Sequence, residues 1–205
     1  MKSLEWFYTD TVKDHFTNPR NVLRQGEAFK EDGEGYVGNP QCGDVMRMLI
    51  QVEKINNKET IKDCRWQTYG CASAIGSTSM LSEMIKGLSL DDALKITPNE
   101  ILNKLGGLPK HKIHCSVLGD KALQAAIYDY WRRTNQPEKI PVIEKKVICK
   151  CLNVTDEEIE HLVLDGVKDF ETLQERTKIS TACGKCRPLA EETLNKYLKK
   201  YNMES

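Results

Sequence analysis

The stretch 69-YGCASAI-75 lies where two patterns of hydrophobic spacing meet, and Cys71 is at its centre. Residues 60–69 alternate between polar and apolar side chains, which is typical of a strand. From Ala72 onward the apolar residues recur at offsets of three and four, which predicts a helix over 72–86 that ends at Gly87. Cys71 is therefore expected at a helix N-terminus, where unpaired N–H groups and the helix dipole favour a thiolate over a thiol.

Two more cysteines lie at similar boundaries between elements. Cys42 is in a glycine-containing loop before an alternating run, and Cys115 comes just before a helical run. Asp44 lies two residues after Cys42, and His114 is adjacent to Cys115. Three thiolates with one oxygen or nitrogen ligand predict a soft-metal site that binds its metal or cluster weakly, because a carboxylate is a harder ligand than a thiolate. A permanent Zn²⁺ site is the alternative, since the same residues would bind zinc.

The second half of the chain carries four cysteines in a different arrangement. Cys149 and Cys151 form a C-x-C motif, and Cys183 and Cys186 form a C-x-x-C motif after the intervening residues 152–182. Four thiolates complete the coordination of either a tetrahedral Zn²⁺ or a [2Fe–2S] cluster, and the spacing does not choose between them. A thioredoxin-type dithiol at 183-CGKC-186 is disfavoured, because no βαβ pattern precedes it and two cysteines would stay unexplained.

The periodicity along the chain predicts an α+β fold for the first domain, with helices packed on an antiparallel sheet, over residues 1–134. A proline-containing, charged stretch without helical period follows and is interpreted as a linker over 135–147. The second domain, 148–205, is expected to be small and all-α, so a bound metal or cluster would supply stability that its core lacks. The expected elements are helix 4–16, a loop-rich stretch 20–43, strands 45–53 and 60–69, helices that begin after Ser89, Thr97, Ser116 and Thr155, and helices 169–176 and 188–200.

The composition excludes several classes of protein. Thirty basic and thirty acidic side chains cancel, so no global field attracts nucleic acid or anionic lipid. No run approaches the roughly 20 apolar residues that a membrane span needs, and residues 1–16 lack the apolar core of an export signal. We therefore expect a cytoplasmic protein whose eight cysteines serve thiolate chemistry and not disulfides.

Some reactive side chains have a simpler interpretation. Cys64 belongs to no motif and has the strand parity of Trp66, so we expect a buried core residue. The histidines outside the cysteine motifs (His15, His111 and His161) are expected to be solvated or capping side chains. Lys112, three residues before Cys115, is either a residue that lowers the pKa of that thiol or an exposed loop lysine.

Three segments closely resemble the cysteine motifs of the IscU-like iron–sulfur scaffold family. They are 35-GYVGNPQCGDVM-46, 69-YGCASAIGSTS-79 and 112-KIHCSVLGDKALQAAI-127. The C-x-C and C-x-x-C half resembles the bacterioferritin-associated-ferredoxin-like [2Fe–2S] domain. The two halves in this order are similar to NifU-type scaffold proteins, and the resemblance covers nearly the whole chain.

The resemblance implies roles for individual residues. Cys42, Cys71 and Cys115 match the cysteines that accept sulfur and hold a transient [2Fe–2S] or [4Fe–4S] cluster. Asp44 matches an aspartate associated with cluster lability, and His114 matches the histidine beside the last cysteine. The four cysteines of the second half match the ligands of a permanent [2Fe–2S] centre: Cys149, Cys151, Cys183 and Cys186.

The same resemblance implies partners and leaves alternatives. A cysteine desulfurase would deliver sulfur, apo iron–sulfur proteins would receive the cluster, and the scaffold, which is not an enzyme, would be a homodimer. Residues 108–112 read LPKHK where scaffolds with a dedicated heat-shock chaperone carry LPPVK, which favours the NifU branch. Longer NifU proteins carry a third domain with its own C-x-x-C, whereas 19 residues follow Cys186, so its carrier step is expected to be absent or supplied elsewhere. A zinc-binding structural module and an electron-transfer ferredoxin are the competing hypotheses.

Overall fold

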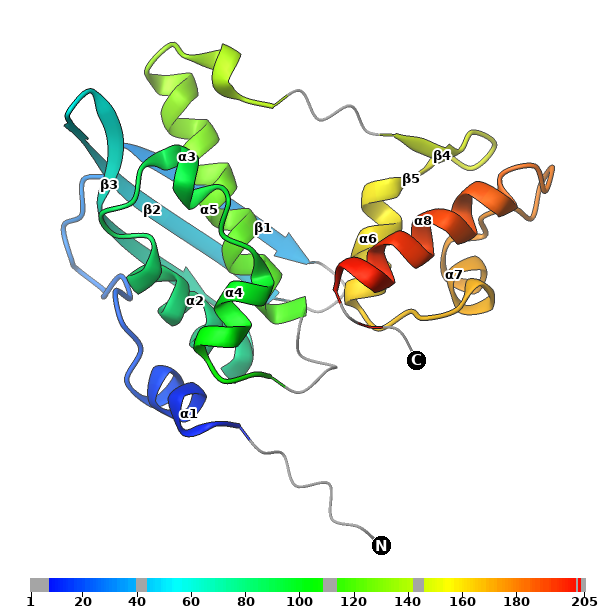
Figure 1. Cartoon of the computed structure of the whole chain (residues 1–205), viewed down its shortest axis with the longest axis horizontal. Coiled ribbons are helices and arrows are strands. Elements are labelled where there is room, and N and C mark those ends of the chain that lie inside the picture. The colour runs from blue at the N-terminus through cyan, green and yellow to red at the C-terminus, as the bar shows by residue number, and fades with distance from the viewer. Residues whose placement is uncertain (1–7, 40–43, 109–113, 142–145, 202, 204–205) are drawn as a thin grey trace, which may run out of the picture. The chain divides into compact units, whose positions relative to one another are not determined.

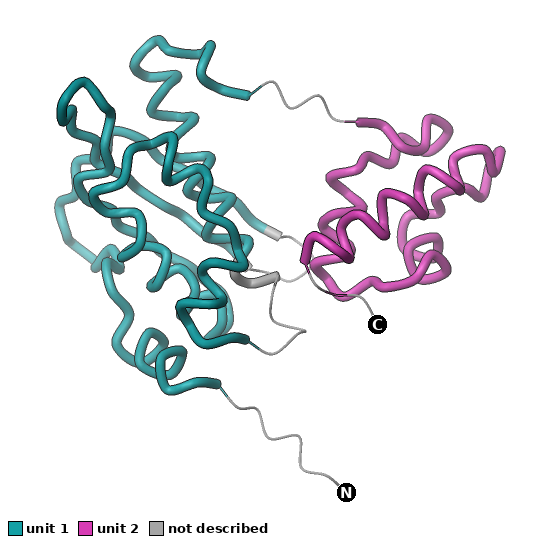
Figure 2. The backbone as a smooth tube through the Cα atoms, in the orientation of Figure 1, with its two compact units in different colours: residues 1–141 teal, residues 142–205 magenta. Residues whose placement is uncertain are grey.

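The structure is a computed structural model that describes residues 8–39, 44–108, 114–141, 146–201 and 203. The chain forms two compact units, residues 1–141 and residues 142–205 (Figure 2). The division falls within the stretch expected to be a linker, 135–147. In the described ranges, no helix combines the length and the apolar character that crossing a membrane requires.

Unit 1 is built on a three-stranded antiparallel sheet. Its strands β1 (Gly33–Asn39), β2 (Asp44–Ile55) and β3 (Lys58–Thr68) are hydrogen-bonded in the order β1-β2-β3. Alternate residues of β2 (Met46, Met48 and Ile50) are fully buried, so one face of the sheet forms the core, as the period of two predicts. Helices pack on this face, and the predicted α+β class is confirmed (Figure 1).

Six helices of unit 1 are described, one before the sheet in the chain and five after it. Their bounds are α1 (Asp10–Thr17), α2 (Ala72–Met84), α3 (Leu90–Ala93), α4 (Pro98–Lys104), α5 (His114–Arg133) and the 3-10 helix η2 (Pro137–Lys139). Helix α5 lies against β1 at two glycines: a Cβ on Gly35 would lie 1.9 Å from the Ala122 carbonyl oxygen, and one on Gly33 would lie 2.3 Å from that of Ala126. These glycines therefore set how closely the longest helix approaches the sheet.

Most predicted element boundaries are confirmed, and the exceptions have physical causes. Ser89 and Thr97 cap α3 and α4 as expected. Strand β1 was predicted to be loop, because glycines at 33, 35 and 38 remove the side chains that would show alternation. Ser116 was predicted to cap the following helix, which instead already begins at His114. Helix α1 begins after Thr9, which accepts a hydrogen bond from the Val12 N–H, and not at residue 4; residues 1–7 lie outside the described ranges.

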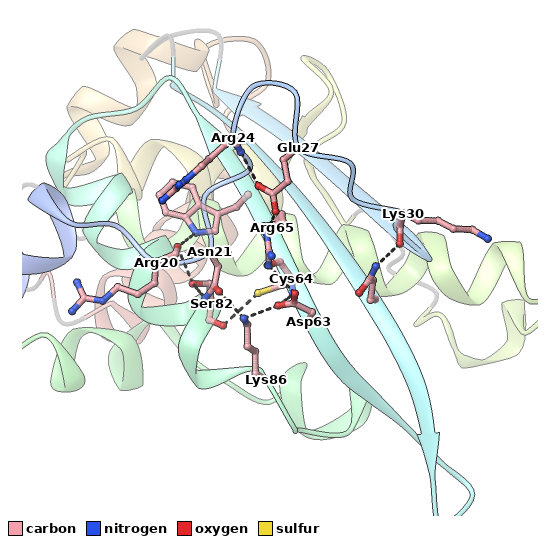
Figure 3. A network of polar contacts seen from close by, with 12 residues as sticks. Arg20, Asn21, Arg24, Glu27, Lys30, Asp63, Cys64, Arg65, Ser82 and Lys86 are labelled. Carbon is pink, nitrogen blue, oxygen red and sulfur yellow. Dashed lines mark hydrogen bonds and ion pairs between the residues drawn. The ribbon is translucent and has the colours of Figure 1, made fainter.

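Polar contacts fasten the segment after α1 to β3 and α2 (Figure 3). The Arg65 guanidinium binds the carboxylates of Glu27 at 2.6 Å and Asp63 at 2.8 Å. The Lys86 ammonium bridges Asp63 at 2.6 Å and the Asn21 side-chain oxygen at 2.6 Å. These pairs are only partly exposed, so they hold the 20–27 segment in register with the sheet.

Cys64 lies beneath this network and is fully buried, which confirms the predicted core position. Its Sγ donates to the Ser82 carbonyl oxygen at 3.4 Å, and burial raises the pKa of the thiol to about 12. A thiol that stays protonated and enclosed at neutral pH is inert.

His15 is buried between α1 and α2, so the prediction of a solvated or capping histidine is wrong. Its Nδ1 lies 2.8 Å from the Ser79 hydroxyl, which also accepts the Arg20 backbone N–H at 2.9 Å. Burial is the main cause that lowers the pKa of His15; the Arg20 guanidinium lowers it further, and Glu83 and Asp14 oppose the shift. An exposed polar sequence around His15 concealed this contact, because its partner lies 64 residues away.

The end of unit 1 is fastened by one carboxylate. Glu59 accepts hydrogen bonds from Tyr130 Oη (3.2 Å), Trp131 Nε1 (3.2 Å), Gln136 Nε2 (2.8 Å) and Lys139 Nζ (3.0 Å). The first part of the stretch expected as a linker therefore packs on unit 1.

Unit 2 is small and mostly helical. It contains the short strands β4 (Val147–Cys149) and β5 (Val154–Thr155) and the helices α6 (Asp156–Leu164), α7 (Phe170–Thr177) and α8 (Arg187–Lys200). Thr155 accepts the Glu158 N–H and begins α6 as predicted; the β4–β5 pair was not predicted, because it is only a few residues long. The core residues include Ile159, Leu173, Ile179 and Leu194, each buried.

Candidate metal centres

The first candidate site lies at one end of the sheet in unit 1. Asn39, the last residue of β1, pairs with Asp44, the first residue of β2, so this hairpin closes over residues 40–43. Cys42 falls in that interval and lies outside the described residues. Asp44 is placed here by its backbone alone, at the end of the sheet where the central strand β2 begins.

Cys71 lies at the same end. Strand β3 ends at Thr68, which pairs with Met46, and the Tyr69 N–H donates to the Val45 carbonyl oxygen at 3.1 Å. The chain therefore leaves the sheet beside the residue that follows Asp44. Cys71 is then the N-cap of α2, with extended backbone angles and no side-chain capping bond, which confirms its predicted position at a helix N-terminus. Its side chain is partly exposed.

Cys115 lies in the first turn of α5, with His114 as the first helical residue. The contacts of Gly33 and Gly35 with α5 show that the helix runs antiparallel to β1, because later helix residues meet earlier strand residues. About seven residues separate Ala122 from Cys115, which is roughly 10 Å of helix, so the first turn of α5 reaches toward the β1 end near Asn39. His111 and Lys112 lie outside the described residues.

A shallow hollow of about 300 Å³ borders this end of the sheet. Its lining includes Pro19, Leu23, Trp66, Tyr69 and Ile75, and Tyr69 is 86% exposed. The sequence did not predict this surface, because its residues come from three separate segments. The hollow reaches Tyr69, which is two residues before Cys71 in the chain, so apolar side chains border the first candidate site.

The second candidate site lies in unit 2, where the four cysteines meet on two loops. Cys151 Sγ lies 3.5 Å from Cys183 Sγ, and the side chain of Cys186 is near enough to Cys149 to help lower the pKa of the Cys149 thiol. Two thiolates bound to one tetrahedral metal at about 2.3 Å lie about 3.8 Å apart, so the Cys151–Cys183 distance is close to what a shared iron or zinc requires. Among the described residues, no group of three or more Cys, His, Asp or Glu side chains that could hold a metal ion is found; the sulfur contacts of this site are those of Cys151 with Cys183 and of Cys186 with Cys149. Two pairs fit a binuclear [2Fe–2S] cluster, which takes two thiolates on each iron.

Backbone N–H groups point at these sulfurs. Burial would raise the pKa of Cys149, but the N–H groups of Ser180 and Leu152 outweigh it and lower that pKa below its ordinary value. The Lys185 N–H is the largest cause that lowers the pKa of Cys183. Donors of this kind stabilise thiolates and tune the potential of a bound cluster.

The backbone around these cysteines has unusual dihedral angles. Asn153 (φ 54°), Lys178 (φ 58°), Ser180 (φ 66°) and Gly184 (φ 72°) all adopt the left-handed conformation around the cysteines. Such angles cost about 1 kcal/mol or more at non-glycine residues and concentrate at functional sites. Sequence reasoning missed Leu152, Ser180 and Lys185 as N–H donors; Gly184 within the C-x-x-C motif was the available signal.

The fold and the two cysteine groups define a class: an α+β domain with cysteines at one end of its sheet, joined to a small helical four-cysteine domain. Residues 7–137 match the family described as NifU-like N terminal domain, and residues 147–196 match the BFD-like [2Fe-2S] binding domain. The chain belongs to the NifU-like N terminal domain family.

Named relatives agree with this assignment. The chain is 40% identical over 191 residues to "Nitrogen fixation protein NifU" of Nostoc sp., which covers 88% of this chain and 61% of the relative. It is 50% identical over 133 residues to "Iron-sulfur cluster assembly scaffold protein IscU 1" of Archaeoglobus fulgidus, which covers 65% of this chain and 82% of the relative. It is 46% identical over 137 residues to the IscU scaffold protein of Aquifex aeolicus, with 65% and 84% covered. The chain therefore spans about three fifths of the length of the NifU relative from Nostoc.

Proposed function

We propose that this protein is an iron–sulfur cluster assembly scaffold. A cysteine desulfurase supplies sulfur, ferrous iron enters, and the transient cluster passes to apo iron–sulfur proteins. The protein acts as a homodimer in the cytoplasm and has no catalytic turnover of its own. The observation that carries the proposal is topological: the paired ends of β1 and β2 that flank residues 40–43, the N-cap Cys71 and the first turn of α5 with Cys115 all belong to one end of the sheet.

The first site holds its cargo through Cys42, Cys71 and Cys115, with Asp44 and His114 beside them. The position of Cys71 at a helix N-terminus supports a thiolate, which is the form that attacks the outer sulfur of a desulfurase persulfide. The old S–S bond breaks as the new one forms, so the sulfur moves to this chain. Two electrons from a separate reductant then convert each such sulfur to sulfide.

The second site keeps its cofactor. Cys149, Cys151, Cys183 and Cys186 would hold a permanent [2Fe–2S] cluster, which supplies one-electron redox chemistry. The match of residues 147–196 to a [2Fe-2S] binding family and the two sulfur pairs support this assignment. The N–H donors of Leu152 and Ser180 orient toward Cys149 and favour its thiolate.

Anaerobic reconstitution tests the division into two sites. Protein is incubated with a cysteine desulfurase, cysteine and Fe²⁺, and the absorption spectrum and the iron and zinc contents are measured. We expect a labile cluster that a chelator removes, together with a second, stable [2Fe–2S] spectrum. The triple variant with alanine at 42, 71 and 115 should lose the first and keep the second. Loss of the stable spectrum in that variant would contradict the division, and zinc at both sites without visible absorption would support a structural zinc protein instead.

Ligand softness gives a test of Asp44. We expect Asp44→Ala to slow the transfer of the transient cluster to an apo-ferredoxin, because a harder, weaker ligand has been removed from the site. Glu53→Ala, an exposed change on the same strand, serves as the matched control. Faster release from the Asp44 variant would show that the assigned role is wrong.

A further inference from the structure

The charges of unit 2 are distributed unevenly around its cysteines. Residues 146–201 contain 10 basic and 10 acidic side chains, so this range is neutral overall. The two segments that carry the cysteines, 146–155 and 176–186, contain no acidic residue; Asp156 and Glu175 are the nearest acidic residues in the chain. Their charged side chains are all cationic and all exposed: Lys146, Lys150, Arg176, Lys178 and Lys185.

Two of these cations adjoin the cysteines in the chain. Lys150 separates Cys149 from Cys151 in the chain, and the positive charge of Lys185 acts on Cys183. Lys178 is two residues before Ser180, whose N–H points at Cys149, and its carbonyl oxygen accepts the Thr181 N–H at 3.2 Å. Among the described residues of this unit, ion pairs join Arg187 to Glu171 and Glu191, and Lys200 to Glu160.

An apolar side chain lies within this charged surface. Leu152 directly follows Cys151, is 40% exposed and belongs to the same loop. An apolar contact within a charged, solvent-accessible rim is the usual anatomy of a transient protein interface. We name this surface the basic edge; it consists of Lys146, Lys150, Leu152, Arg176, Lys178 and Lys185.

The charge of a bound cluster does not account for the basic edge. Two ferric ions, two sulfides and four thiolates form a dianion, whereas the edge carries five cations. The two cysteine segments would therefore keep a net positive charge even with an oxidised cluster bound, and the exposed Cys151 and Cys183 put the cluster within reach of a docked molecule. A local field of one sign attracts a partner of the opposite sign and raises the rate of encounter.

We propose that the basic edge is the docking site for an acidic one-electron redox protein. One electron leaves the reduced partner and converts one ferric ion of the cluster to ferrous, and no atom is transferred. The inference rests on the proposed [2Fe–2S] centre of unit 2, and it adds the chemistry of the partner and the surface that recognises it.

The test uses the full-length protein with its cluster and two probes, the acidic protein flavodoxin and the basic protein cytochrome c. Affinity is measured by calorimetry, and the rate of electron transfer is measured by stopped flow. Raising the ionic strength from about 20 mM to about 200 mM should weaken flavodoxin binding and slow its reaction at least about tenfold, because exposed charges are screened. Cytochrome c should show no measurable affinity.

Charge reversal locates the surface. Lys178→Glu, which adjoins no cysteine in the chain, and Lys185→Glu should each weaken flavodoxin binding about tenfold at low salt. Lys199→Glu makes the same change 13 residues beyond Cys186, about 20 Å along α8, and should alter binding less than twofold. Leu152→Ser should weaken binding without changing its salt dependence.

The possible outcomes separate the two proposals. Absence of a stable [2Fe–2S] spectrum in unit 2 would refute the proposed cofactor. An intact spectrum with salt-independent binding, or an equal effect of Lys199→Glu, would refute the docking surface. Salt-sensitive self-association that Lys178→Glu abolishes would overturn it in favour of a second copy of this chain.

Discussion

The carboxylate of Glu59 is predicted to hold the end of unit 1 in place, and replacing it should weaken that unit measurably. It has four hydrogen-bond donors, of which Tyr130 and Trp131 are 7% and 2% exposed. In Glu59→Ala these two buried donors lose their acceptor at about 1–3 kcal/mol each, whereas Gln136 and Lys139 return to water at little cost. We expect a loss of about 2–4 kcal/mol in the free energy of unfolding, and about 1–2 kcal/mol for Glu59→Gln, which retains an acceptor oxygen.

The effect should depend on pH with a definite sign. Burial would raise the pKa of the Glu59 carboxyl, but hydrogen bonds from Gln136, Lys139 and Trp131 outweigh it and lower the pKa. A lowered pKa means that the contribution is complete above the unfolded-state value of about 4.3 and is lost as the pH falls through the folded-state value. The difference between wild type and Glu59→Gln should therefore shrink below about pH 4.

Tryptophan fluorescence during urea unfolding measures the free energy of unfolding of unit 1 alone. All three tryptophans (Trp6, Trp66 and Trp131) belong to unit 1, so unfolding of unit 2 does not contribute. Glu53→Ala, at an exposed position of β2, is the control and should stay within about 0.5 kcal/mol of wild type. The reasoning would be refuted if Glu59→Ala behaved like this control.

Three further predictions concern buried positions of unit 1. Gly35→Ala should lower the free energy of unfolding by more than about 3 kcal/mol or abolish soluble expression, because its Cβ would lie 1.9 Å from a backbone oxygen of α5. The control Gly76→Ala, where the nearest atom would lie 3.6 Å from the new Cβ, should be neutral or stabilising by up to about 1 kcal/mol. Equal effects of the two substitutions in urea unfolding would contradict this prediction. Cys64, with its pKa raised to about 12 by burial, should resist iodoacetamide in the native protein at pH 8, as peptide mass spectrometry would show; rapid labelling without unfolding would disprove it. The lowered pKa of His15 makes its contribution complete above about pH 6.5 and progressively lost as the pH falls below that value, so His15→Gln should flatten the stability curve of unit 1 between about pH 5 and 7.

Local patterns in the sequence predicted most helices, and long-range contacts explain what they missed. Side-chain spacing located β2, β3 and α2 and placed Cys71 at a helix N-terminus, because each of these features is written in neighbouring residues. Strand β1 was not predicted because its glycines break the alternating pattern. They are glycines because α5, about 90 residues later in the chain, lies too close to leave room for a side chain. His15 was misjudged for the same reason, since its partner Ser79 belongs to another helix. The roles of the cysteines came from motif resemblance, and the assignment of individual ligands stays a prediction.

The two sites differ in what holds their cysteines in place, and this difference bears on the proposed division of labour. Cys71 is the N-cap of α2 and Cys115 lies in the first turn of α5, so a helix of unit 1 sets the backbone position of each. In unit 2 the segments around the cysteines include three left-handed non-glycine residues, Asn153, Lys178 and Ser180, and N–H donors aimed at sulfur. In the proposed division, the first site offers three thiolates with Asp44 beside them, and a carboxylate holds a soft cluster less firmly than a thiolate does. The second site offers four thiolates, which complete the coordination of a [2Fe–2S] cluster, and N–H donors that stabilise their charge. Transient occupancy of the first site and permanent occupancy of the second would then follow from the number and type of ligands in each set.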